Sequence, residues 1–461
     1  MALTKTPVKG MKDILPEEMA VRDYAIALIK ETYKTFGFTP IETPCVEHIG
    51  NLTSKQGGEN ESLIYKIMKR GEKLSLEGVS SPDELADNGL RYDLTVSLCR
   101  FYANNLDKLP NPFKALQIGN VWRADKPQKG RYRQFTQCDI DVLGESSMLA
   151  EIELITATST LLGKLGFSGF TVRLNHRRLL KAMALSCGFP QESSEKVFII
   201  LDKMDKIGPE GVSTELIAAG LPPGAVEDYM GFFRPRADES LLERCAEKLL
   251  HLSGQAGGGN DGGGSALAEE AAGAGETTDA GETTDAGDTA GDAGEIAAAV
   301  EDIRTVMACI ESVRESIPAD FRLVFDPTLV RGMGYYTGPI FEISLKEFGS
   351  SVGGGGRYDR LVGSFTSLQA PACGFSIGFE RIISVLMDKG FTVPSPEKKI
   401  AFLAEKGLDK EELCAMLLEA GRLRGEGQKV LVAAKSKNGK HQREQLEKDG
   451  YTEVRSFNHS R

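Results

Sequence analysis

Basic and acidic side chains stand close together in one short segment, VWRADKPQKGRYRQFTQCDIDVLG. Its first half carries Arg123 and Arg131. Their planar guanidinium groups donate paired hydrogen bonds and stay charged when desolvated, which suits a polyphosphate. Its second half alternates apolar residues with Gln137, Asp139 and Asp141. Side chains alternate across a strand, so these three share one face and can form a pocket floor. A basic wall beside an acidic floor fits a site that joins an anionic nucleotide to an amine.

The elements that must position these side chains follow from apolar spacing and from turn residues. The segment itself is predicted to form two strands joined by a turn. Further along the chain, GFSIGFERIISVLMDKG is predicted to be a strand that turns into a helix, and SSVGGGGRYDRLVG a loop whose glycines let the backbone approach a ligand closely. The tail after residue 398 alternates strand and helix, which predicts a βαβαβ module.

Five separated segments together resemble one family. The segment that opens with Val121 is similar to motif 2 of the class II aminoacyl-tRNA synthetases in their histidyl form, and GFSIGFERI is similar to motif 3. GFTPIETPCVE resembles motif 1, with Pro44 as its proline. PVKGMKDILP and LVRGMGYYTGPIFE resemble the N-terminal histidyl signature and the histidine-binding segment. The similarity covers about residues 7–390, apart from one acidic insert.

The resemblance implies an α+β fold with a class II synthetase core, in which helices flank a mainly antiparallel sheet. The core is expected at residues 1–175 and 321–395, a helical insertion at 176–320, and a shortened anticodon-binding-like α/β domain at 398–461. Within the insertion, residues from about 253 to 295 are mostly Gly, Ala, Thr, Asp and Glu. Such a composition cannot bury enough apolar surface to order the chain, so a disordered linker is predicted there.

An ATP site is implied in the same way, with ATP and Mg²⁺ as cofactors. Arg123 would contact the α-phosphate and the carboxylate of the amino acid, and Arg331 would stabilise the α-phosphate opposite the attacking carboxylate. These two arginines are the catalytic candidates. Asp125 would also help to hold the metal. The remaining ATP-binding residues implied by the resemblance are Asp125, Arg131 on the pyrophosphate, Arg381 on the γ-phosphate, and Phe135, which would sandwich adenine with Arg381.

The implied histidine site uses other residues. Its ammonium group would be received by Asp93, Thr95 and Gln137, and its imidazole by Asp141 and Tyr336. Two carboxylates in one pocket suit a ligand with an ammonium at one end and a ring N–H at the other. An amino acid without the ring would leave buried acceptors unpaired, at about 1–3 kcal/mol each. The implied set also includes Arg331, Tyr335 and Gly355, with Gly354, Gly356 and Tyr358 beside the pocket.

The composition of the chain limits its possible binding partners, its location and the state of its cysteines. The net charge of −11 argues against indiscriminate nucleic-acid binding, although a local basic groove remains compatible with it. No stretch resembles a signal peptide or a membrane span, so a cytoplasmic location without membrane contact is expected. The eight cysteines form no CxxC pair and are expected to be reduced, mostly buried thiols. Trp122 is expected in the core, and the five histidines to be structural or exposed.

The implied reaction is ATP-dependent ligation of L-histidine to tRNA(His) through a histidyl-adenylate, with release of AMP and pyrophosphate, by a homodimer. One alternative is a non-catalytic, synthetase-like regulatory subunit of ATP phosphoribosyltransferase in histidine biosynthesis. The arginines argue against it, and the short tail, which ends after its third strand, argues for it. A class II synthetase for another amino acid is disfavoured by RGMGYYTGPIFE together with QCDID. Gly334 stands where many relatives have aspartate, and the basic run KSKNGKHQR is either a phosphate-contacting surface or a solvated helix start.

Overall fold

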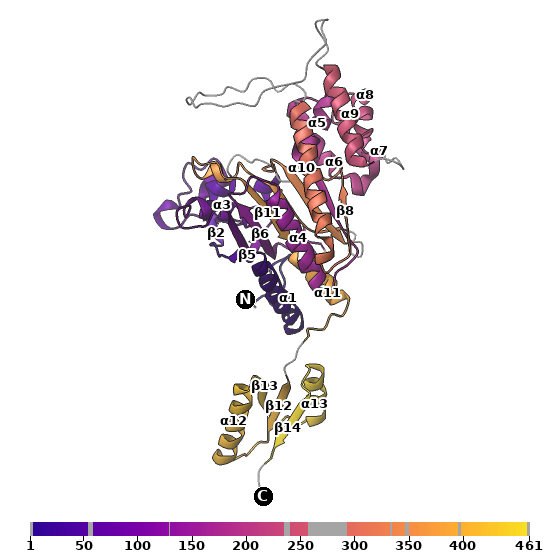
Figure 1. Ribbon diagram of the computed structural model, residues 1–461. Helices are drawn as coiled ribbons and strands as arrows, with labels where there is room; N and C mark the ends of the chain where they lie inside the picture. The colour runs from indigo at the N-terminus through magenta and orange to yellow at the C-terminus, as the bar shows by residue number, and fades with distance from the viewer. Residues whose placement is uncertain are drawn as a thin grey trace, which may run out of the picture. The chain divides into compact units, whose positions relative to one another are not determined.

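The computed structural model describes residues 3–53, 59–128, 130–234, 240–256, 293–331, 334–345, 350–394 and 398–458. They form two compact units, Met1–Gly390 and Phe391–Arg461 (Figure 1). Each unit has its own sheet and its own apolar core.

The first unit is built on an eight-stranded sheet with the order β1-β5-β6-β11-β10-β9-β7-β8. Only the pairs β1/β5 and β7/β8, at its two edges, are parallel, and all the others are antiparallel. The mainly antiparallel sheet expected for the core is therefore confirmed. Its strands are β1 Thr39–Pro40, β5 Phe113–Trp122, β6 Gln134–Leu143, β7 Phe170–His176, β8 Phe321–Phe325, β9 Pro339–Leu345, β10 Ser350–Arg357 and β11 Ala372–Ile377.

Helices flank this sheet (Figure 1). α1 packs against α4 and α11, while α3 and a short 3₁₀ helix, Val362–Ser364, enclose a second part of the core with residues of β5 and β6. A small antiparallel sheet, β2-β4-β3, packs against α2 through β2 and β4. The bounds are α1 Pro16–Thr35, α2 Ile49–Thr53, α3 Thr95–Ala103, α4 Leu149–Lys164, α11 Phe379–Asp388, β2 Val46–His48, β3 Lys66–Met68 and β4 Ala86–Leu90.

A group of helices gathers at the β7–β8 edge of the sheet (Figure 1). The chain leaves the sheet at the end of β7 and returns along α10, which packs against α4, α5, α9 and β7. The expected linker is helical at both ends, because α9 reaches Ala256 and α10 begins at Ala293. Residues 257–292 lie outside the described part of the chain. The helices are α5 Arg177–Ser186, α6 Ser194–Leu201, α7 Met204–Ala218, α8 Pro223–Met230, α9 Leu241–Ala256 and α10 Ala293–Ser312.

The glycine run is predicted by its composition to be a loop, and this prediction is wrong. Residues 350–357 form β10, a central strand between β9 and β11. A β-carbon on Gly355 would lie 1.8 Å from the carbonyl oxygen of Gly374, and one on Gly356 would lie 2.7 Å from that of Pro339. Glycine disfavours strands by propensity, but here only glycine lets the neighbouring backbones approach so closely.

The second unit is the predicted βαβαβ module. Its sheet has the order β13-β12-β14, and all strands are parallel. Alternate residues of β12 face opposite sides of the sheet. Ile400 and Phe402 pack under α12, and Ala401 and Leu403 pack against Leu446 of α13. The bounds are β12 Lys399–Ala404, α12 Lys410–Gly425, β13 Lys429–Ala434, α13 Gly439–Lys448 and β14 Glu453–Phe457.

Candidate active site

The β5–β6 hairpin supplies the acidic floor. The two strands pair from Phe113 with Leu143 to Trp122 with Gln134. The other edge of β6 pairs with β11, so β6 is an inner strand of the sheet. Gln137, Asp139 and Asp141 are exposed by only 8%, 3% and 3%. Strand alternation thus places three polar side chains on one face of a buried strand.

Four carboxylate and amide oxygens of this pocket are among the buried atoms that have no hydrogen-bond partner in the described part of the chain. They are Asp93 Oδ2, Gln137 Oε1, Asp139 Oδ1 and Asp141 Oδ2. Asp93 lies just before α3, and its other oxygen accepts from the backbone N–H of Val96 at 3.2 Å. An unpaired buried acceptor costs about 1–3 kcal/mol, so such a group is expected to serve a ligand that donates N–H groups.

The carboxyl groups affect one another's ionisation. Burial raises the pKa of Asp141 to about 7, opposed by a hydrogen bond from Tyr358 and reinforced by the charge of Asp93. Burial also raises the pKa of Asp139 well above its ordinary value, and the charge of Asp141 raises it further. The carboxyls of Asp93, Asp139 and Asp141 therefore lie near one another, although they come from two segments of the chain. A cation placed among them would favour their ionised forms.

Aromatic side chains stand next to these acceptors. The rings of Tyr335 and Tyr336 are 5.0 Å apart, and Tyr335 meets Tyr358 edge-on at 6.0 Å. The hydroxyl of Tyr358 donates to Asp141 Oδ1 at 2.6 Å. Tyr335 is hydrogen-bonded to Thr95, which brings the first residue of α3 into the same group. Flat rings and fixed acceptors of this kind are suited to an imidazole.

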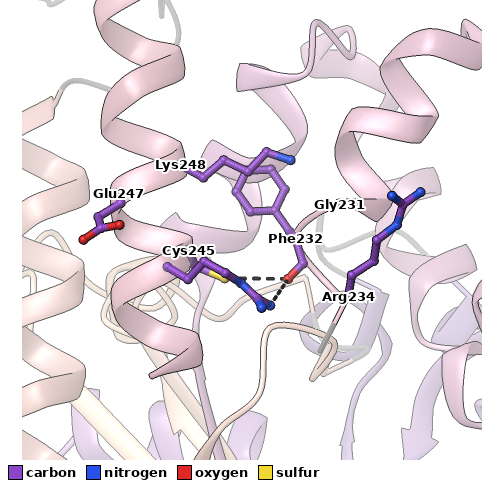
Figure 2. Close-up of a pocket in the computed structure, with 7 residues that line it drawn as sticks. Gly231, Phe232, Arg234, Cys245, Glu247 and Lys248 are labelled. Atoms are coloured by element: carbon purple, nitrogen blue, oxygen red, sulfur yellow. Dashed lines mark hydrogen bonds between the residues drawn. The ribbon is translucent and has the colours of Figure 1, made fainter. Parts of the chain in front are cut away.

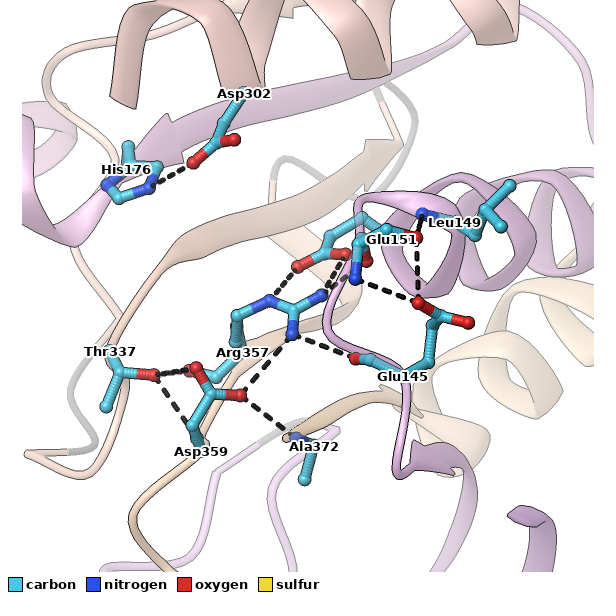
Figure 3. Close-up of polar contacts among 10 residues, drawn as sticks. Glu145, Leu149, Glu151, His176, Asp302, Thr337, Arg357, Asp359 and Ala372 are labelled. Atoms are coloured by element: carbon cyan, nitrogen blue, oxygen red, sulfur yellow. Dashed lines mark hydrogen bonds and ion pairs between the residues drawn. The ribbon is translucent and has the colours of Figure 1, made fainter. Parts of the chain in front are cut away.

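A buried ion pair fixes the backbone on either side of Tyr358 (Figure 3). Arg357 donates to both carboxylate oxygens of Glu151 on α4, each at 2.7 Å, and Glu151 is fully buried. On the other side, Asp359 accepts from the backbone N–H of Ala372 at 3.0 Å and from the hydroxyl of Thr337 at 3.2 Å. Tyr358 is thereby held in the position from which it donates to Asp141.

Three arginines from distant segments converge at the other end of the site. Burial lowers the pKa of Arg381, and the nearby charges of Arg131 and Arg331 lower it further. Arg331 is held by Glu342 at 2.9 Å, and Arg381 donates to the backbone carbonyl of Ser351. A β-carbon on Gly354 would lie 2.5 Å from Arg331 Nη1, so glycine at this position makes room for the guanidinium. Arginines gathered in this way are suited to binding a polyanion.

Arg123 joins the two ends of the site. Its Nε donates to the carbonyl of Tyr92 at 2.8 Å, and its guanidinium lies 5.3 Å from the ring centre of Phe135. Its charge lowers the pKa of Asp93, which burial raises. Arg123 therefore stands near an acceptor of the acidic floor as well as near the aromatic ring that the resemblance assigns to adenine.

One carboxylate is available for a magnesium ion among the arginines. Asp125 is mostly buried and pairs with half-exposed Arg131 at 3.1 Å. Within the described ranges, no cluster of three or more His, Cys, Asp or Glu side chains could hold a metal ion. Mg²⁺ is commonly bound through one or two carboxylates together with phosphate oxygens and waters, and Asp125 fits that partial role.

A second buried ion pair connects α1 and α11 and contacts β6. Arg22 on α1 donates to both oxygens of Glu380, at 2.6 and 2.9 Å. Glu380 also accepts from the backbone N–H of Thr136 on β6 at 3.1 Å. Because Arg381 follows Glu380 in α11, this pair sets the position of Arg381 relative to the hairpin.

Several residues of this site have no role that the sequence alone predicts. Asp139 is predicted on the correct face without a function, and nothing in the motifs singles out Ser376 or Glu342. A carboxylate in the otherwise apolar strand PIFEISL is a usable signal for Glu342. Ser376 carries no such signal. Gly334 is exposed, and a β-carbon there would meet nothing within 4 Å, so the structure leaves room for an aspartate at this position.

Other expectations had mixed outcomes. Trp122 is only half-buried, at the end of β5, where its indole donates to Gln134 at 3.2 Å, so placing it in the core was wrong. His176 is buried and accepts from the backbone N–H of Arg178 at 3.1 Å, as a structural histidine does. All eight cysteines are free and four of them are buried.

A cavity of about 390 Å³ lies in the helical insertion and shares no residue with the site (Figure 2). The cavity is lined by Gly231, Phe232, Arg234, Arg244, Cys245, Glu247 and Lys248.

No helix in the described part of the chain combines the length and apolar character needed to cross a bilayer.

Comparison with known proteins gives a consistent result. A family model described as histidyl-tRNA synthetase matches residues 10–255 and 269–382. The histidine--tRNA ligase of Leifsonia xyli subsp. xyli is 41% identical over 393 residues, which cover 84% of this chain and 81% of the relative.

Solved structures agree on the fold. The crystal structure of histidyl-tRNA synthetase from Nostoc sp. PCC 7120 superposes with a TM-score of 0.71 at 25% identity, covering 97% of this chain and 90% of that chain. An ATP phosphoribosyltransferase regulatory subunit/histidyl-tRNA synthetase from Bacillus halodurans C gives 0.69 at 18% identity, covering 99% of both chains. At that identity the likeness shows the fold alone.

Proposed function

The chain belongs to the histidyl-tRNA synthetase family, and from that premise we propose how its site ligates L-histidine to tRNA(His). The observation that carries the proposal is the convergence of Arg131, Arg331 and Arg381 near one end of a site whose other end holds four unpartnered acceptors among the described residues. The first end is suited to a triphosphate, and the second to a ligand with several N–H donors.

Histidine binds at the acidic end. Asp93 and Gln137 accept from its ammonium group, with Thr95 beside them, and Asp141 accepts from the imidazole N–H. Tyr335 and Tyr336 pack against the ring. An amino acid without a ring N–H leaves the buried Asp141 Oδ2 without a donor, and discrimination against it is correspondingly large.

ATP lies along the arginines. Arg131 and Arg381 hold the outer phosphates, and adenine lies between Arg381 and Phe135. Asp125 would hold Mg²⁺, which would supply further positive charge to the polyphosphate. A histidine carboxylate oxygen then attacks the α-phosphorus. The bond between the α-phosphorus and the bridging oxygen breaks, and pyrophosphate leaves with its electron pair.

Charge placement drives this displacement. Negative charge develops on the oxygens of the α-phosphate, where Arg123 and Arg331 are held in advance by Tyr92 and Glu342. Such preorganised donors need no rearrangement during the reaction. In the second half of the reaction, a hydroxyl of the terminal tRNA ribose attacks the histidyl carbonyl carbon, and AMP leaves with the electron pair of the broken bond.

Histidine-dependent exchange of pyrophosphate into ATP tests the first half, and charging of tRNA(His) tests the whole reaction. We expect both activities. The regulatory-subunit alternative would be supported by the absence of exchange together with binding of the phosphoribosyltransferase catalytic subunit. Its sole support among the comparisons given above is the Bacillus halodurans structure, which shares the fold.

We further infer a homodimer in the cytoplasm. The family places the motif 1 region at a two-fold axis, and β2 and β3 nearby expose Val46 by 46% and Met68 by 53%. Apolar side chains on a small sheet are suited to burial by a second copy. Light scattering at micromolar protein would give twice the chain mass, and a monomer mass would contradict the proposal.

A further inference from the structure

The carboxyl of Asp139 is held by a short hydrogen-bonded chain. Asp139 lies on β6 between Gln137 and Asp141 and faces Ser376 across the β6–β11 ladder. Gln137 Nε2 donates to Ser376 Oγ at 3.0 Å, and Ser376 is hydrogen-bonded in turn to the Asp139 carboxyl. A serine hydroxyl has a single proton, so it accepts from the amide and donates to the carboxyl.

This chain fixes the orientation of two acceptors. Because Gln137 uses its nitrogen on Ser376, its oxygen remains free. Because Asp139 Oδ1 has no partner among the described residues, Ser376 binds the other carboxyl oxygen. The charges that act on the Asp139 carboxyl are those of Asp141, Asp93 and Arg123, so it lies among the groups assigned to histidine.

The number of N–H donors on histidine indicates a role for Asp139. Histidine with a neutral ring has three ammonium N–H groups and one ring N–H, which makes about four donors. The free acceptors in the described part of the site number four, namely Asp93 Oδ2, Gln137 Oε1, Asp139 Oδ1 and Asp141 Oδ2. Without Asp139 Oδ1, only three of these buried acceptors would remain for the four donors.

We propose that Asp139 is a further histidine-binding residue, which accepts one ammonium N–H of bound histidine through Oδ1 and is oriented by Ser376. The inference rests on the proposed function, since it assumes histidine as the ligand. Gln137, Asp139 and Asp93 then surround the ammonium, and Asp141 is left to the imidazole. The ammonium also makes the ionised form of Asp139 favourable, because it is an opposite charge at short range.

The test compares two ligands that differ only at the ammonium. L-Histidine carries it, and 3-(imidazol-4-yl)propionate lacks it. Calorimetry would measure the binding of both to the full-length wild type and to the variant Asp139→Asn. We expect the variant to bind histidine about tenfold to a hundredfold more weakly, as for the loss of a hydrogen bond to a charged group, and the deaminated ligand within about twofold of wild type. In pyrophosphate exchange, KM for histidine should rise by a similar factor while KM for ATP is unchanged.

Ser376→Ala is the companion variant, because it removes the aiming hydroxyl and adds no charge. It should weaken histidine binding in the same ligand-selective way, by a smaller factor, and it keeps the test available if Asp139→Asn does not fold. Equal weakening of both ligands in these variants, or unchanged histidine binding, would overturn the proposal. Because binding is measured directly, these outcomes are separate from failure of the proposed function, which would appear as wild-type protein without histidine-dependent exchange.

Discussion

Replacing Asp141 by asparagine should stabilise the fold while impairing its function. Asp141 is 3% exposed, and burial raises its pKa from the ordinary 3.8 to about 7. A carboxyl whose pKa is raised on folding binds its proton more tightly in the folded state. Its contribution to stability is therefore fully present below about pH 4 and is lost as the pH rises towards 7. Asparagine has no proton to lose and avoids this loss.

The size of the effect follows from the pKa values. Between about pH 5 and the folded pKa of about 7, the wild type loses about 1.4 kcal/mol per pH unit through this group, or about 3 kcal/mol in all. The variant should therefore gain about 3 kcal/mol on the wild type between about pH 5 and about pH 8. Asp93 and Asp139 titrate in both proteins. Removing the charge of Asp141 also eases the ionisation of Asp139, so the coupling has the same sign.

Urea unfolding followed by tryptophan fluorescence is the assay, since the single tryptophan, Trp122, lies on β5 in the same unit as Asp141. The free energies of unfolding of both proteins would be compared at the two pH values. A difference between the proteins that is the same at both values would refute the reasoning, because it would mean that Asp141 does not titrate in this range. In parallel, KM for histidine in pyrophosphate exchange should rise about tenfold or more, since the amide cannot replace the charge that faces the imidazole.

Three further predictions concern other parts of the site. Arg381→Ala should abolish histidine-dependent pyrophosphate exchange with the fold intact by circular dichroism, and a near-normal rate would remove Arg381 from the site. Glu380→Gln leaves the buried Arg22 guanidinium with only the more distant carboxylate of Glu18, 3.6 Å away, so urea unfolding should show a loss of about 3 kcal/mol, partly recovered in the double variant with Arg22→Met. Gly355→Ala places a β-carbon 1.8 Å from the backbone of β11 and should prevent soluble expression. The control is Gly363→Ala, whose β-carbon would lie 3.5 Å from the Gln369 side chain, and it should be tolerated. Equal solubility of the two variants would contradict the packing role of Gly355.

Local pattern predicts much of the molecule. Strict alternation in QFTQCDIDVL is enough to place Gln137, Asp139 and Asp141 on one face, because a strand has a period of two residues. Apolar spacing in the tail gives the βαβαβ module in the same way. The class of fold is implied by the resemblance of five ordered motifs to a known family.

Pattern fails where a neighbour in space decides the outcome. Four consecutive glycines have the propensity of a loop, yet they form β10, because the carbonyl oxygens of Gly374 and Pro339 leave no room for a β-carbon. Trp122 has the side chain of a typical core residue, yet it lies at the end of a strand and reaches Gln134.

The sequence by itself determined which chemical groups are present and which face of its strand each one occupies, since both depend on residues within a few positions of one another. Only the tertiary structure decided which groups meet. The charges of Arg131 and Arg331 act on Arg381 because the fold brings the three guanidinium groups together. Tyr358 donates to Asp141, and Ser376 orients Asp139, only after strands more than 200 residues apart have paired. These contacts depend on packing across the sheet, which no local spacing encodes.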